Sequence, residues 1–223
     1  LYGVEALARW THPQLGNISP VRFIPLAEEC GLIGALSQWA LREACRQLAD
    51  WRSRGLVIPA VSVNLSPTNF HNLELPRAIA ETLRAHALAP SDLTVEITES
   101  VLMDTHPSTL KTIAEIHAQG VRLAMDDFGT GYSSLGYLRQ LPVTELKLDK
   151  SFVSSLNDDH ATRALTHAVI RIGDSLRLTV VAEGVETAAQ RSILRSQGYH
   201  IAQGYLFSPP LPAPALERWL QAR

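Results

Sequence analysis

Seven apolar runs of this chain each carry a polar side chain at or near their C-terminal end. The set contains five carboxylates and one lysine, and its members are Glu5, Asn64, Glu96, Asp126 with Asp127, Lys147, Glu183 and Gln203. Two carboxylates about 4 Å apart repel each other by roughly 4 kcal/mol at an effective dielectric constant near 20. If these side chains meet at one place, the carboxylates must take up protons or bind cations.

The donor atoms of this set indicate which cation would fit. All the candidate ligands offer oxygen, and neither Cys nor His is among them, which favours Mg²⁺ or Mn²⁺ over Zn²⁺. Two divalent ions would balance the net charge of the five carboxylates and the lysine. The adjacent pair Asp126 and Asp127 suits a two-metal site, the usual device for in-line phosphoryl displacement. The residues therefore predict a metal-dependent enzyme that acts on a phosphate ester.

A simpler interpretation exists for each of these residues taken alone. A carboxylate at the end of a strand can cap the following helix or pair with a surface lysine. The metal-site interpretation depends on all seven strand ends meeting at one edge.

The elements that must position these residues alternate between strand and helix. We expect strands over residues 1–7, 59–65, 93–98, 121–127, 145–149, 178–183 and 199–205. We expect a helix from Pro20, capped by Ser19, to Gly31, and a longer one that ends near Arg54 at Gly55. Further helices are expected over residues 74–87, 107–119, 132–140, 159–175, 187–197 and 213–222.

This order of elements predicts a parallel α/β fold. Strands joined by helices of about ten or more residues need parallel crossovers. The C-terminal ends of such strands converge on the mouth of a β/α barrel, where these folds place their active sites. Seven strands are found where a closed barrel has eight, so either the sheet is open or one strand precedes residue 1. No linker divides the chain, and we expect one domain over residues 1–223.

Smaller features complete the structural expectations. Trp39 and Trp51 are expected in the core on the apolar side of one helix, and Cys30 and Cys45 as small buried residues. Asp159 is expected to cap a helix. The glycine-rich loop over residues 127–134 could bind a ligand or simply join a strand to a helix. It lacks the Gly-Lys-Ser/Thr ending of a nucleotide P-loop.

Composition excludes several classes of protein. The chain has 223 residues, 46% of them hydrophobic and 19% charged, which is typical of a soluble globular domain. A formal net charge of −2 offers no basic field for a nucleic-acid polymer. No apolar run is long enough to span a membrane, so no membrane contact is expected. Two cysteines and no signal peptide fit a cytoplasmic location. Because the sequence begins at Leu1 without Met, we expect a fragment of a longer protein.

The residues also resemble a known family, the EAL-domain phosphodiesterases of bacteria, which hydrolyse cyclic di-GMP. The resemblance covers essentially the whole chain and rests on ordered motifs. These are Glu5-Ala6-Leu7 with Arg9-Trp10 and His12-Pro13, Phe23-Ile24-Pro25-Leu26-Ala27-Glu28, Val63-Asn64-Leu65-Ser66, Glu96-Ile97-Thr98-Glu99, Asp126-Asp127-Phe128-Gly129-Thr130-Gly131, Lys147-Leu148-Asp149, Glu183-Gly184-Val185-Glu186 and Gln203-Gly204-Tyr205.

The resemblance implies a fold and partners. The family fold is a modified TIM-type (β/α)8 barrel with one antiparallel strand. Its first strand carries a Tyr-Gln-Pro motif and precedes the Glu-Ala-Leu strand, so that strand would lie upstream of residue 1. A homodimer is implied, as is attachment to sensory or GGDEF domains in a parent protein, which could be anchored in a membrane.

The resemblance also implies roles for matching residues. Glu5, Asn64, Glu96 and Asp126 would bind one metal ion, and Asp126, Asp127 and Glu183 the second. Lys147 would orient the attacking water. Leu7, Arg9, Gln203 and Glu186 would contact substrate, and Glu99 would hold the loop over residues 127–134 in its active shape.

The implied reaction is attack of metal-activated water on one phosphodiester, giving linear pGpG. Two alternatives stay open at this point. One is a receptor that binds cyclic di-GMP without turnover, and the other is an unrelated metal-dependent barrel enzyme.

Overall fold

The computed structural model describes the chain except residues 104–105, 131–137, 139, 158 and 223. The chain forms two compact units, each with its own strands and helices. The first contains residues 1–97 and 104–122, and the second contains residues 98–103 and 123–223. The prediction of a single domain over residues 1–223 stays a prediction.

Three parallel strands organise the first unit. They are β1 (Val4–Ala6), β4 (Val61–Asn64) and β5 (Leu93–Thr98), paired in the order β1-β4-β5. The burial pattern of β5 is almost uniform, as expected for a strand covered on both faces. The helices of this unit are α1 (Pro20–Glu29), α2 (Ile33–Ser53), α3 (Leu75–Ala85) and α4 (Thr109–Ala118). Short 3-10 turns, η1 (Pro67–His71) and η2 (Pro90–Asp92), precede α3 and β5.

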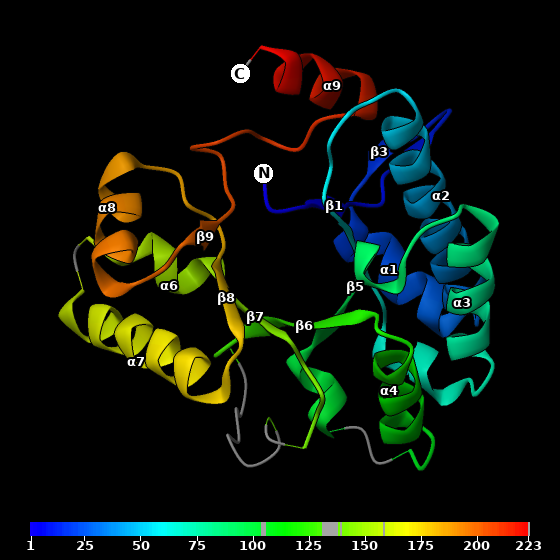
Figure 1. Ribbon diagram of the computed structural model, residues 1–223, viewed down its shortest axis with the longest axis horizontal. Helices are drawn as coiled ribbons and strands as arrows, with labels where there is room; N and C mark the ends of the chain where they lie inside the picture. The colour runs from blue at the N-terminus through cyan, green and yellow to red at the C-terminus, as the bar shows by residue number, and fades with distance from the viewer. Residues whose placement is uncertain (104–105, 131–137, 139, 158, 223) are drawn as a thin grey trace. The chain divides into compact units, whose positions relative to one another are not determined.

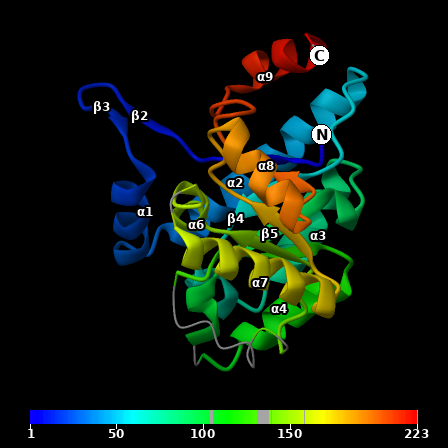
Figure 2. The same ribbon diagram turned by 90° about the vertical axis from the view of Figure 1, so that its left-hand side faces the viewer.

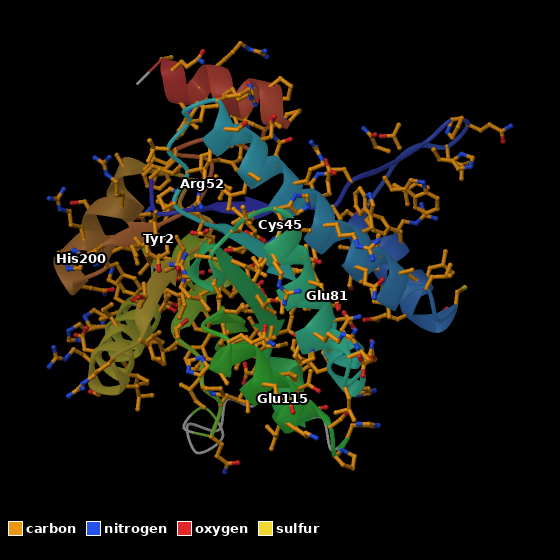
Figure 3. All side chains as sticks on the ribbon, turned by 45° about the vertical axis from the view of Figure 1, so that its right-hand side comes forward. Tyr2, Cys45, Arg52, Glu81, Glu115 and His200 are labelled. Carbon is orange, nitrogen blue, oxygen red and sulfur yellow. The ribbon has the colours of Figure 1, made fainter. Side chains whose placement is uncertain are left out.

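The core of the first unit lies where α2 packs on β4 and α3 (Figure 1). Cys45, Leu48 and Ile79 are fully buried there, and Figure 3 shows Cys45 on α2. Arg52, near the end of α2, binds both carboxylate oxygens of Asp92 at 2.7 and 2.9 Å. This ion pair fastens the end of the helix to the turn that leads into β5.

Four parallel strands organise the second unit. They are β6 (Arg122–Phe128), β7 (Glu145–Leu148), β8 (Thr179–Ala182) and β9 (Ile201–Ala202), paired in that order. The helices are α6 (Lys150–Ser154), α7 (His160–Leu176), α8 (Ala188–Gln197) and α9 (Ala213–Gln221), and η3 (Glu99–Met103) is a 3-10 turn. Helix α7 packs on β7, β8 and α8 (Figure 2).

The seven predicted strands correspond to β1 and β4–β9, and the predicted helices appear with ends shifted by a few residues. Asp159 caps α7 as expected, because its side chain accepts hydrogen bonds from the backbone N–H groups of Ala161 and Thr162. The helix expected over residues 132–140 lies mostly outside the described residues. No helix in the described part of the chain is long and apolar enough to cross a membrane.

Two expectations of local structure, for Trp39 and Cys30, were wrong, and the predicted N-cap Ser19 differs in one detail. Trp39 is 52% exposed whereas Trp51 is buried. Twelve residues of helix correspond to about 120° of rotation, so the two rings cannot share one face. Cys30 is exposed because it lies just after the end of α1. Ser19 precedes α1 as expected, but its side chain makes no capping hydrogen bond.

The sequence analysis also missed short elements. β2 (Trp10–His12) and β3 (Gly16–Ile18) form a small antiparallel sheet of their own. Three-residue strands with exposed side chains leave no alternating apolar pattern to find. Among the described residues, β1, β4 and β5 pair in parallel in the first unit, and β6, β7, β8 and β9 pair in parallel in the second.

Candidate metal and phosphodiester site

A cluster of three carboxylates lies at the ends of β6 and β8 in the second unit. Asp126, Asp127 and Glu183 each offer one oxygen, and these three oxygens lie within 4.8 Å of one another. Asp127 adopts a left-handed backbone conformation with φ +54°, which costs a non-glycine residue about 1–3 kcal/mol. Such local strain is characteristic of sites where surrounding structure fixes a side chain for function.

Lys147 neutralises part of this cluster. Its side chain is 3% exposed, and Nζ lies 2.8 Å from Glu183 Oε1 and 3.2 Å from Asp126 Oδ1. Strand β7 lies between β6 and β8, so an inward side chain on β7 reaches the carboxylates on both neighbours. A lysine this deeply buried requires such partners, because an unpaired buried charge is strongly disfavoured.

Asp126 retains an oxygen suited to a cation. Its buried Oδ1 has no hydrogen-bond donor within the described part of the chain, although Lys147 is close enough for Coulomb attraction. A buried carboxylate oxygen without a donor is costly. A divalent metal ion would satisfy it, so the carboxylates present fit the predicted ligand class.

Gln203 completes the second-unit group. Its Nε2 donates to Glu183 Oε1 at 2.7 Å, and its backbone N–H donates to the carbonyl of Ala182. Glu183 is therefore held between the amide of Gln203 and the ammonium of Lys147. Oε1 of Glu183 thus accepts a hydrogen bond from Gln203 and forms an ion pair with Lys147. Together these contacts orient the carboxylate.

The pKa of Asp127 is raised in this setting. Partial desolvation of its carboxyl group is the largest cause, even though the residue as a whole remains exposed to solvent. The neighbouring charges of Asp126 and Asp149 raise the pKa further, and Lys147 opposes them. Asp127 thus holds a proton more readily than an ordinary aspartate, unless a cation replaces it.

A second polar group lies at the strand ends of the first unit. Asn64, the last residue of β4, donates from Nδ2 to Glu5 Oε1 on β1 at 2.8 Å. Asn64 also stands in register with Glu96 on β5, whose side chain is buried. The structure brings these three predicted ligands together at one edge of β1-β4-β5.

The other predicted site residues have different local surroundings. Leu7 and Arg9 are exposed between β1 and β2, with the guanidinium of Arg9 donating to the carbonyl of Ala8. The backbone N–H of Glu186 donates to Gln190 at the start of α8. Glu99 is buried at the start of η3. Part of the loop it was expected to hold, residues 131–134, lies outside the described residues.

Sequence reasoning missed the short helix α6 (Lys150–Ser154). Asp149 caps α6 by accepting hydrogen bonds from the backbone N–H and hydroxyl of Ser151. Burial favours a higher pKa for Asp149, but these hydrogen bonds outweigh it and hold the pKa below its ordinary value. The Asp-Lys-Ser pattern is a capping signal that could have revealed this helix.

Comparison with known proteins identifies the family. The EAL domain family matches residues 1–210.

The chain belongs to the EAL domain family.

Among curated proteins, this EAL domain is 49% identical over 222 residues to the oxygen sensor protein DosP of Escherichia coli K12, covering 100% of the chain and 28% of that protein. It is 44% identical over 216 residues to MucR of Pseudomonas aeruginosa, named as a bifunctional diguanylate cyclase and cyclic di-GMP phosphodiesterase, covering 97% of the chain and 32% of that protein. The chain therefore spans less than two thirds of the length of these relatives.

Solved structures agree with this assignment. A structure described as the PaMucR phosphodiesterase in complex with c-di-GMP has a TM-score of 0.91 and 44% identity, and covers 97% of this chain and 87% of that one. The EAL enzyme Bd1971 with cAMP and cyclic di-GMP bound has a TM-score of 0.88 and 29% identity, and covers 98% and 59%. The α/β fold class expected from the sequence is confirmed.

Proposed function

We propose that this EAL domain hydrolyses cyclic di-GMP to linear pGpG in bacterial second-messenger signalling, with divalent metal ions as cofactor. The observation that carries the proposal is the set of contacts around Lys147. A buried ammonium group, two carboxylates that contact it and a third carboxylate within reach are all in place. The similarity to MucR and to the PaMucR complex with c-di-GMP supports this choice of substrate.

The metal ligands follow from the two polar groups. Asp126, Asp127 and Glu183 would hold one ion, and their mutual distances support that assignment. Glu5, Asn64 and Glu96, together with Asp126, would hold a second ion, an assignment that rests on the family resemblance. All donors are oxygens, which favours Mg²⁺ or Mn²⁺. When bound, such ions lower the pKa of water and stabilise charge on phosphate oxygens.

The chain's own residues would supply orientation and charge. Lys147 would orient the attacking water and offset carboxylate charge. Arg9 would bind a substrate phosphate, for which a guanidinium group is well suited. Gln203 would position water or substrate beside Glu183, while Leu7 and Glu186 would contact the dinucleotide. Glu99 would act through the loop over residues 127–134.

The proposed hydrolysis consumes one water molecule and needs no other reactant besides cyclic di-GMP. The water oxygen forms a bond to one phosphorus atom, and the bond from that phosphorus to the 3′ oxygen breaks. The 3′ oxygen takes up a proton, and the new 5′ phosphate remains on the linear product. In-line geometry requires the water and the leaving oxygen to lie on opposite sides of the phosphorus.

The proposal also covers the parent protein, the oligomeric state and the location of the domain. Its relatives are several times longer, which supports attachment to sensory or GGDEF domains in a parent protein. We expect the domain to act as a homodimer in the cytoplasm. Sedimentation of the chain would test the dimer directly.

Incubation with cyclic di-GMP, followed by chromatography, tests the proposed activity. The reaction is run with Mg²⁺, with Mn²⁺ and with chelator, and the K147M variant serves as the matched control. We expect pGpG with either metal ion, none with chelator and far less with K147M. Saturable binding of intact cyclic di-GMP without pGpG would instead assign the domain to the receptor class.

A further inference from the structure

The short helix α6 (Lys150–Ser154) begins directly after the strand that carries Lys147. Its start is fixed by Asp149, which accepts hydrogen bonds from the backbone N–H and hydroxyl of Ser151. The backbone N–H of Phe152 donates to the carbonyl of Asp149 at 3.2 Å. The side chains of Lys150 and Phe152 are thereby held at a defined place beside the ends of the neighbouring strands.

Phe152 packs against Gly129, which lies two residues after Asp127. A Cβ atom on Gly129 would lie 2.8 Å from Cζ and 2.9 Å from Cε2 of the Phe152 ring. Gly129 also has φ +98°, a conformation that L side chains rarely adopt. The ring therefore lies in close contact with the backbone two residues after Asp127.

Lys150 makes the equivalent contact at the end of β8. A Cβ atom on Gly184 would lie 2.4 Å from Cβ and 3.2 Å from Cα of Lys150. Gly184 directly follows Glu183 and has φ +67°. One short helix thus touches the chain just after Asp127 and just after Glu183.

These contacts matter because the strand ladder is interrupted at the carboxylates. The register between β6 and β7 joins Met125 to Leu146 and then Phe128 to Leu148, with a bulge between them. Asp126 and Asp127 lie in that bulge, where regular pairing with β7 does not fix the backbone. Three carboxylates this close repel one another before a cation arrives, and Lys147 offsets that repulsion at Asp126 and Glu183. Contacts that fix the backbone beside Asp126 and Asp127 would add to this restraint.

We propose that α6 is a positioning element for the metal ligands and that Phe152 is its principal positioning residue. By packing on Gly129, the ring keeps Asp126 and Asp127 within reach of Glu183 in the metal-free chain. This inference rests on the proposed function, because it takes those carboxylates as metal ligands. The phenyl ring of Phe152 offers no ligand atom to a metal ion, so its role is to act through the backbone after β6.

Phe152→Ala, compared with Val153→Ala, separates positioning from general stability. Val153 is a fully buried neighbour on the same helix, and its truncation also leaves a cavity. For each variant we would measure Mn²⁺ affinity by calorimetry, the unfolding temperature, kcat and KM. Hydrogen exchange of the amides over residues 126–129 would be measured in chelator.

We expect Phe152→Ala to impair metal binding and Val153→Ala to impair mainly stability. Phe152→Ala should weaken Mn²⁺ binding and lower kcat by about 10- to 100-fold each, as losses of supporting contacts around metal ligands do, with KM changed little. Exchange over residues 126–129 should accelerate. Phe152→Leu, which keeps an apolar group against Gly129, should recover most of the loss. Val153→Ala should lower the unfolding temperature while Mn²⁺ affinity stays close to that of the unsubstituted chain.

Two results would overturn the positioning role. One is unchanged Mn²⁺ affinity and unchanged exchange in Phe152→Ala, and the other is an equal loss of affinity in Val153→Ala. If the unsubstituted chain binds Mn²⁺ but releases no pGpG, the proposed activity fails, and the affinity comparison still decides the role of Phe152. If it binds no Mn²⁺, the ligand assignment and this inference fall together.

Discussion

The ammonium nitrogen of Lys147 lies 2.8 Å from Oε1 of Glu183, with both side chains largely removed from solvent. The contact joins two neighbouring parallel strands at the end where their polar residues gather. Asp126 Oδ1 lies 3.2 Å from the same nitrogen. The ammonium group of Lys147 is therefore shared by two candidate metal ligands, Asp126 and Glu183. The lysine therefore links the charge balance of the cluster to its proposed chemistry.

Replacing Lys147 with Met should abolish most turnover. The substitution keeps much of the side-chain volume but removes the charge that offsets the carboxylates and orients water. We expect kcat for cyclic di-GMP to fall by about 10²–10³-fold, the range seen when one preorganised polar group is lost. Lys111→Met is the matched control, since Lys111 is exposed on α4. Equal rates in both variants would contradict the assigned role.

Glu5→Gln tests the metal ligands of the first unit. The amide keeps an oxygen that can accept the hydrogen bond from Asn64, so the fold should be preserved. The lost negative charge should weaken metal binding and nearly abolish hydrolysis. Circular dichroism and Mn²⁺ titration would be measured together with pGpG formation. Near-full activity would show that Glu5 is not a ligand. Glu115→Gln, on the exposed face of α4, controls for general charge effects.

The raised pKa of Asp127 makes the metal-free chain sensitive to pH. Between the ordinary pKa and the raised one, the folded chain binds more protons at this site than the unfolded chain does. Its contribution to the free energy of unfolding therefore increases as pH falls through that window, and this gain is lost as pH rises through the raised pKa. Asp127→Asn should raise the unfolding temperature in chelator near about pH 7 and remove this site's part of the pH dependence.

Metal binding should respond in the opposite direction. Protons compete with cations for the Asp127 carboxylate, so Mn²⁺ affinity should fall as pH is lowered toward the raised pKa. Calorimetric titrations at several pH values would measure this trend. An affinity independent of pH across that window would mean that Asp127 is not a ligand.

The ion pair between Arg52 and Asp92 should contribute measurably to stability. The guanidinium group binds both oxygens of Asp92 and also donates to the carbonyls of Ile58 and Pro59. Charge-assisted hydrogen bonds contribute about 1.5–3 kcal/mol, so Arg52→Ala should lower the free energy of unfolding by about that amount. Arg46→Ala on the same helix, which removes an exposed pair, should cost less than about 1 kcal/mol.

The same pair should weaken in acid. Burial alone would raise the pKa of Asp92, but hydrogen bonds from Arg52 and from the backbone of Ala89 hold the pKa below its ordinary value. The stabilisation is therefore present above the ordinary aspartate pKa and is lost as pH falls through the lowered one. Denaturant unfolding at neutral and acidic pH would measure the difference between the unsubstituted chain and Arg52→Ala. A difference that stays constant with pH would contradict this account.

Much of this arrangement could be predicted because each strand carries its own signal. A buried parallel strand reads as an apolar run, so a polar residue at its end, such as Glu183, stands out. The contact between Lys147 and Glu183 then follows from adjacent strands with converging ends. Helix α7 could be predicted equally well, because the capping residue Asp159 precedes a long amphipathic pattern.

Other features depend on distances that no local pattern encodes. The bulge at Asp126 and Asp127 is visible only in the pairing of β6 with β7. The close approach of Phe152 to Gly129 likewise needs the folded backbone.

The most direct test is hydrolysis of cyclic di-GMP in water enriched in heavy oxygen, analysed by mass spectrometry. With Mn²⁺ present, the account predicts pGpG that carries one solvent oxygen in its terminal phosphate. Chelator or the Lys147→Met substitution should suppress the labelled product. Absence of pGpG under all conditions, or pGpG formed equally well in chelator, would contradict the account.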